Sequence, residues 1–182
     1  MAPEMSHDKT AEDLRAIRLD QFIAHPPAKV WRALTDPELV ARWLMPNDFK
    51  PEVGHRFTFT TEPKKQVGFD GIVYCEVLEL VPEKLLKISW SDRKRADWTV
   101  SWRLEAEGRG TRLFLDHEGF DPDDELQQLS RRIMGGGWRS SHFRAIAAIV
   151  DELPELAELA ELAELAELAE LAELDGKLGD EL

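Results

Sequence analysis

Alternation of apolar and polar residues predicts β-strands through the middle of the chain. The period is two over residues 55–60 and again over residues 96–104, where Trp98, Val100, Trp102 and Leu104 fall on one face. Shorter apolar runs bounded by turn residues predict further strands, at residues 14–25, 69–81, 84–91 and 111–117. Five of the six strands follow one another directly, which favours an antiparallel sheet.

Helical spacing of apolar residues appears on both sides of these strands. Two short helices are predicted over residues 28–34 and 38–44, the second after the capping pair Asp36 and Pro37. A long helix is predicted from residue 123 to about 153, with a break, kink or close packing contact at Gly135, Gly136 and Gly137 because each glycine costs about 1 kcal/mol relative to alanine.

The order of elements predicts an α+β fold in which the long C-terminal helix covers the sheet. A sheet with one apolar face must bury that face, and Phe143, Ile146, Ala147 and Val150 give the last helix a matching apolar side. If a curved sheet wraps the helix without filling the space between them, a pocket remains.

A different pattern begins after Pro154, where Glu-Leu-Ala is repeated six times over residues 155–172. These residues favour a helix. With a period of three, successive leucines are displaced by about 60° around the helix, so no fixed apolar face and no coiled-coil seam results. The tail is either an interaction or oligomerisation arm or a low-complexity expansion with little role, and we favour the second.

The negative charge belongs to this tail. Of the net charge of −13, residues 151–182 carry −11, from twelve acidic residues and Lys177, so −2 remains for residues 1–150. A nearly neutral body without a basic stripe excludes nucleic acid as an expected partner. Residues 1–13 lack the apolar core of a signal peptide, and no apolar run is long enough to span a membrane. Cytoplasmic localisation without membrane association is therefore expected.

Candidate chemistry is sparse. Cys75 is the only cysteine and the histidines are scattered, so we expect no disulfide within the chain, no metal site and no cofactor. The only acid–base combination to nominate is His117 with Tyr74 or His142, and nothing in the sequence shows that these groups converge. The sequence leaves catalysis open and favours a protein that is not an enzyme, with no catalytic residue assigned.

Large rings at inward-facing positions are the better indication of a site, because they can line a cavity without filling it. Each of them can also be an ordinary core residue. The residues expected to contact a ligand are Phe57, Phe59, Trp90, Trp98, Trp102, Leu113, Leu115, His117, Trp138 and His142.

Four segments, HPPAKVWRALTDPELVARWL, GIVYCEVLELVPEKLLKISW, GTRLFLDHEGF and GGWRSSHF, resemble the START-like or SRPBCC superfamily, and are most similar to the branch named after the activator of heat-shock protein 90 ATPase. The resemblance covers residues 14–153, between a flexible N-terminus at 1–13 and the acidic repeat tail at 154–182. It implies a helix-grip fold, a curved antiparallel sheet around a long C-terminal helix.

Members of this superfamily typically hold an apolar small molecule, and some act as cyclases or bind a chaperone. Three hypotheses follow for this chain. It binds or sequesters an apolar small molecule in an internal cavity, it is a chaperone-binding module of the ATPase-activator kind, or it is a cyclase or hydrolase acting in the same cavity. The sequence identifies neither the ligand nor the oligomeric state.

The repeat tail itself yields a prediction. Glutamates on neighbouring turns repel one another, and protonation relieves this repulsion. A peptide of residues 153–176 should therefore gain helicity as the pH falls below about 5, near the ordinary carboxylate pKa. Circular dichroism at neutral and acidic pH measures the change, and equal helicity at both would contradict the interpretation.

Overall fold

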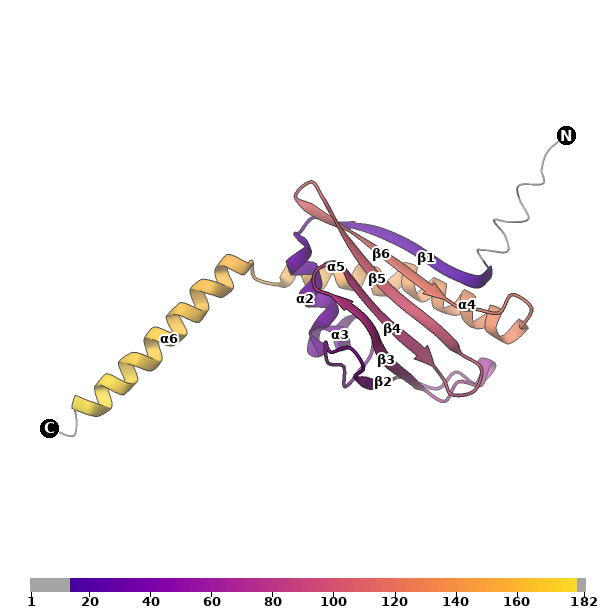
Figure 1. Ribbon diagram of the computed structural model, residues 1–182, viewed down its shortest axis with the longest axis horizontal. Coiled ribbons are helices and arrows are strands. Elements are labelled where there is room, and N and C mark those ends of the chain that lie inside the picture. Colours follow the sequence, from indigo (N-terminus) through magenta and orange to yellow (C-terminus); the bar gives the residue numbers. More distant parts are fainter. Residues whose placement is uncertain (1–13, 180–182) are drawn as a thin grey trace. The chain divides into compact units, whose positions relative to one another are not determined.

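The computed structural model describes residues 14–179 and contains one six-stranded antiparallel sheet (Figure 1). The N-terminal segment 1–13, which we expected to be flexible, lies outside the described residues. The strands run in the order β1-β6-β5-β4-β3-β2, so the first strand pairs with the last. Their bounds are β1 Ala16–Ile23, β2 Arg56–Thr60, β3 Ile72–Val81, β4 Leu85–Ser91, β5 Asp97–Glu107 and β6 Gly110–Glu118.

Two short helices follow β1, α2 (Pro27–Thr35) and α3 (Pro37–Trp43). Each begins with a proline, which is tolerated in a first turn because the N–H that it lacks would have no partner there. Asp36 caps α3, since its carboxylate accepts a hydrogen bond of 3.0 Å from the backbone N–H of Glu38. The short 3₁₀ turn Lys65–Val67 lies between β2 and β3.

The C-terminal helix of the domain has three parts. These are α4 (Glu125–Gly137), a π-helical turn (Trp138–His142) and α5 (Phe143–Glu152), and they run across one face of the sheet (Figure 1). The predicted α+β helix-grip arrangement is thereby confirmed. The three glycines stay helical, and the irregularity comes directly after them, where the N–H of Phe143 bonds to the carbonyl of Trp138. Gly135 is buried beside Ile17 of β1, so a close packing contact is present as well.

The helix is joined to the sheet through a buried hydrogen bond. Trp138 Nε1 donates to His117 Nδ1 at 3.2 Å, and both side chains are almost completely buried, at 1% and 0% exposed. Because Nδ1 accepts this bond, a neutral His117 carries its proton on Nε2. Nε2 is buried without a hydrogen-bond partner. The ring is surrounded by those of Trp90, Trp98 and Phe120, which lie 4.9–5.6 Å away between centroids.

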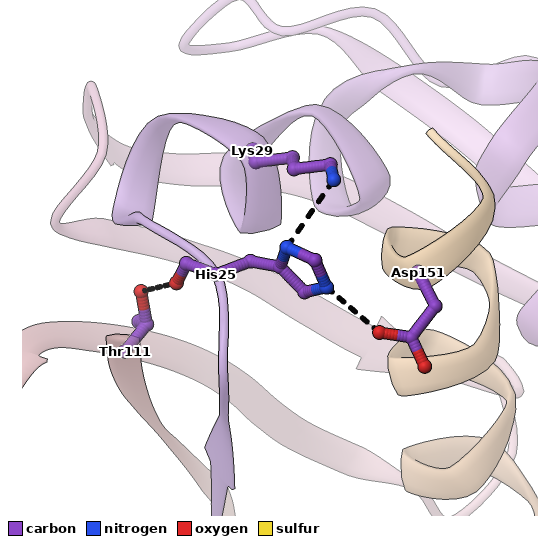
Figure 2. Close-up of polar contacts among 4 residues, drawn as sticks. All are labelled: His25, Lys29, Thr111 and Asp151. Carbon is purple, nitrogen blue, oxygen red and sulfur yellow. Dashed lines mark hydrogen bonds and ion pairs between the residues drawn. The ribbon is translucent and has the colours of Figure 1, made fainter. Parts of the chain in front are cut away.

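A second polar cluster holds the end of α5 to the start of α2 (Figure 2). Asp151 Oδ1 accepts a 2.7 Å bond from His25 Nε2, and the other ring nitrogen of His25 lies 3.2 Å from the ammonium group of the buried Lys29. The hydroxyl of Thr111 on β6 donates to the carbonyl of His25 at 2.7 Å. One tautomer of His25, with its proton on Nε2, satisfies both side-chain contacts. The cluster thus ties β6, α2 and α5 together where the domain ends.

The chain forms two compact units, one ending at Asp151 and the other beginning at Glu152. Residues 153–155 are not helical, and the helix α6 (Leu156–Gly179) contains most of the Glu-Leu-Ala repeat. Leu162, Leu165, Leu168, Leu171 and Leu174 are each exposed by more than half of their surface, so the repeat leaves them in solvent within this unit. Within residues 14–179, no helix combines the length and the apolarity that crossing a membrane requires.

Burial of His117 makes the stability of the domain depend on pH. Burial lowers the pKa of His117 to about 3, compared with roughly 6.5 for an unperturbed histidine. The free energy of unfolding therefore has its full value, as far as His117 is concerned, above about pH 6.5. It decreases as the pH falls below this value, because the unfolded chain takes up a proton on His117 that the folded domain does not. Between pH 7 and pH 5, His117 should lower the free energy of unfolding by about 2 kcal/mol.

Urea titrations followed by tryptophan fluorescence measure this difference, because all six tryptophans lie between residues 31 and 138. Between pH 7 and pH 5, the free energy of unfolding of the variant His117→Gln should decrease by about 2 kcal/mol less than that of the parent protein, whatever the stability of the variant at pH 7. The same loss in both proteins would show that His117 is not the group responsible.

Candidate ligand cavity

A cavity of about 240 Å³ lies between the sheet and α4. The sheet contributes β3, β4 and β5, and the helical side contributes α4 and the π-helical turn. Residues after α3 and around the 3₁₀ turn complete the wall. The residues that line the cavity are Leu44, Met45, Thr61, Lys64, Val67, Phe69, Val73, Trp90, Ser91, Asp92, Ala96, Trp98, Ser130, Ile133, Met134, Trp138 and His142.

Three tryptophans form the inner part of this wall. Trp90 and Trp98 are directly opposite each other on β4 and β5, and Trp138 contacts Trp90 edge-on with centroids 6.3 Å apart. The indole of Trp98 donates to Gln127 Oε1 at 3.2 Å, which fixes its orientation against α4. Rings held in this way are stiff, so the cavity keeps its shape without a ligand. The arrangement suits a flat, apolar molecule.

Asp92 is a charged residue on the wall. Its Oδ1 accepts hydrogen bonds from the backbone N–H groups of Lys94, Arg95 and Ala96 at 2.8–2.9 Å. Partial burial by itself would raise the pKa of Asp92, but these backbone hydrogen bonds together lower it below the ordinary value. Asp92 therefore stays ionised at neutral pH, and its position is set by the turn that follows β4.

His142 brings a polar ring to the other side of the cavity. Nδ1 lies 2.9 Å from the backbone carbonyl of Trp43, at the end of α3, and the ring contacts Trp138 with centroids 5.0 Å apart. The side chain is only partly buried. This hydrogen bond joins His142 to Trp43, which is 99 positions earlier in the sequence, and it fixes the imidazole ring at the end of the π-helical turn.

The structure brings four of the ten expected site residues together around this cavity, namely Trp90, Trp98, Trp138 and His142. Phe57, Phe59 and Trp102 instead surround a second void of about 10 Å³, which is too small for a ligand. Leu113, Leu115 and His117 are completely buried and belong to neither wall. Of the ten expected residues, we therefore keep only Trp90, Trp98, Trp138 and His142 as proposed ligand contacts. Other residues on the cavity wall, which the alternation pattern did not select, are added to them.

The added residues come mainly from loops and from α4. Met134 precedes Trp138 by four residues, and Ser130 precedes Met134 by four, so helical spacing from Trp138 would have identified both. Leu44, Met45, Val67 and Phe69 lie outside the strands, where no periodic signal marks them.

Of the nominated acid–base groups, only His142 lines the cavity, because His117 is completely buried and is not part of the wall. Tyr74 alternates with the cavity-lining Val73 on β3, so its side chain leaves the opposite face of the sheet, where the Arg93 guanidinium lies 3.7 Å from its ring centre. Burial raises the pKa of Cys75, so its thiol stays protonated and unreactive. Among residues 14–179, no three histidine, cysteine, aspartate or glutamate side chains are grouped as metal ligands would be.

Comparison with known proteins agrees with the fold and with the position of the domain. Protein MLL2253 from Mesorhizobium loti is 32% identical, with a TM-score of 0.68 over 78% of this chain and all of that one. CalU16 from Micromonospora echinospora is 25% identical, with a TM-score of 0.59 over 85% of this chain and 86% of that one.

PFC0360w, described as an HSP90 activator from Plasmodium falciparum, has a TM-score of 0.59 over 75% of this chain and 96% of that one, and at 18% identity it shows the fold alone. A search among curated proteins found no match. The sequence pattern of one family matches residues 24–151, which is most of the chain and nearly the whole of the domain, and the resemblance expected from the sequence is confirmed. The chain belongs to the family of activator of Hsp90 ATPase homolog 1-like proteins.

Proposed function

We propose that this protein binds an apolar aromatic small molecule in the cavity between the sheet and α4, in the cytoplasm. The observation that carries the proposal is a cavity of about 240 Å³ with rigid aromatic walls. Protein interiors are otherwise close-packed, and voids larger than a water molecule are few. A concave, mostly apolar lining with a few polar groups is the common form of a small-molecule site.

The affinity would come from burial of the ligand against the tryptophan rings. At about 25 cal/mol per Å² of buried apolar surface, a two-ring aromatic molecule gains several kcal/mol before the cost of ordering is subtracted. The rings of Trp90, Trp98 and Trp138 are already held by their neighbours, so little ordering cost falls on the protein. Binding of a simple aromatic probe with a Kd between about 0.1 and 1 mM is therefore expected.

Filling the cavity tests the proposal. Met134→Trp should place a large ring in the cavity and lower the affinity for 2-methylnaphthalene, measured by equilibrium dialysis, by at least about tenfold, the equivalent of about 1.4 kcal/mol. Arg132→Trp is the matched control, because Arg132 is exposed on the same helix and does not line the cavity. Binding that is equal in the two variants would place the probe elsewhere, and no binding to the parent protein would overturn the proposal.

Membership of the family favours a second candidate, association with a chaperone ATPase of the Hsp90 type. This association would use the outer surface of the domain or the repeat tail instead of the cavity. The two candidates therefore make opposite predictions for the same variants.

If the chaperone candidate is correct, Met134→Trp should bind and stimulate a purified Hsp90 ATPase as well as the parent protein does. A chain ending at Leu153 should lose the association if the tail provides the contact, and it should still bind 2-methylnaphthalene. Pull-down and ATP turnover measure the first property, and dialysis measures the second. Absence of any association with the parent protein would exclude this candidate.

A further inference from the structure

The tautomer of His142 is determined by its surroundings. Nδ1 lies 2.9 Å from the carbonyl oxygen of Trp43, and a carbonyl can only accept a hydrogen bond. Nδ1 must therefore carry a proton. In the neutral ring Nε2 then presents a lone pair and acts as an acceptor.

This lone pair has no partner from the part of the chain that the structure describes. The only hydrogen bond of His142 there is the one from Nδ1, and Nε2 is not among the buried atoms that lack a partner. A half-buried ring on the cavity wall thus leaves an acceptor that a bound molecule can reach.

Gly137 leaves the space beside Nε2 open. A Cβ at position 137 would stand 3.5 Å from Nε2 and 3.7 Å from the neighbouring ring carbon, so any larger residue would cover that edge of the ring. Gly136, one residue earlier, differs in this respect because a Cβ there would have no atom within 4 Å.

The π-helical turn brings His142 into line with the other cavity residues of the helix. Ser130, Met134, Trp138 and His142 are each four residues apart, and all four line the cavity. In an α-helix, residues four apart are displaced by about 40° around the axis. The wider π-helical turn rotates each residue by less than an α-helix does, so His142 does not drift further in the same direction, and the imidazole stays on the same side as the indole.

Other polar groups on the wall offer further acceptors. The carboxylate of Asp92 stays ionised and can only accept a hydrogen bond, whereas Ser91 Oγ, which accepts from the backbone N–H of Arg93, keeps its O–H as a donor. The hydroxyl of Ser130 donates within its own helix, to the carbonyl of Leu126, and keeps its lone pairs. Lys64 and Thr61 can donate, but both are exposed at the outer part of the cavity. The cavity therefore complements a ligand that donates a hydrogen bond.

We propose that Nε2 of His142 accepts a hydrogen bond from a hydroxyl or N–H group on the aromatic ligand, so that the cavity selects phenol-like molecules over hydrocarbons of the same shape. The inference rests on the proposed binding function and specifies the chemical class of the ligand. Gly137 serves as a positioning residue, because it keeps the acceptor uncovered.

The experiment compares two probes of nearly equal shape, 2-naphthol and 2-methylnaphthalene, by equilibrium dialysis at pH 8. The quantity of interest is the ratio of their affinities, because it cancels general effects on the cavity. One hydrogen bond should favour 2-naphthol by about three- to tenfold relative to a site that lacks it.

His142→Phe removes the acceptor and keeps a ring, and Gly137→Ala keeps the histidine but covers Nε2. Both variants should reduce the ratio by about three- to tenfold, whereas Gly136→Ala should leave it at the parent value. Gly137→Ala keeps the test valid if loss of the bond to Trp43 prevents His142→Phe from folding.

The possible results distinguish ligand binding in the cavity from recognition of a donor group by His142. If both probes bind the parent protein and the ratio is the same in all variants, the cavity is a binding site but His142 does not recognise a donor. If neither probe binds the parent protein, the proposed function fails, and this inference fails with it. If only the two test variants lose preference for 2-naphthol, the inference is supported.

Discussion

The hydrogen bond from the indole of Trp138 to His117 joins the C-terminal helix to the sheet inside the core. An indole N–H enclosed by a protein core needs an acceptor, and the strand β6 supplies one nitrogen at 3.2 Å. The bond can form only while His117 is neutral, so it depends on an interior dry enough to exclude the imidazolium form. This bond, together with the ring contacts of Trp138 to Trp90, Trp102 and His142, holds one wall of the cavity in place.

The cavity persists because its walls cannot collapse inward. Trp98 is held by Gln127 on α4, Trp138 is held by His117, and the ring of Trp90 is wedged between Phe59 and Trp138. On the helical side, Ser130 is small and Met134 is flexible, so neither fills the remaining volume. A void that would normally close by repacking is therefore retained by polar anchors at the ends of large rings.

The sequence predicted the fold far better than it predicted the cavity. Alternation and short apolar runs bounded by turn residues located the strands to within a few residues, because both patterns are local properties of the sequence. The same alternation placed Trp98 and Trp102 on one face, but it could not show that Trp98 borders the larger void while Trp102 packs against Trp43. That difference depends on which element covers each end of the sheet, and the pairing of β1 with β6 and the position of α3 are long-range properties.

The hydrophobic periodicity of the sequence could not predict two further features. The three glycines indicated an irregularity, but the π-helical turn that follows them depends on packing at Trp138. The contact between His142 and the carbonyl of Trp43 joins residues that are far apart in the chain, so no local pattern could indicate it.

The Glu-Leu-Ala helix is determined by its repeat and not by contacts such as those that hold the cavity. Each copy of the repeat adds about 4.5 Å of helix and one negative charge. Every interior copy also has the same neighbours as the one before it, because the sequence repeats without variation over residues 155–172. Insertion or loss of a copy would change the length and the charge of this unit but would create no new kind of surface. Within this unit, the copy number therefore sets reach and total charge and not the kind of surface that is presented.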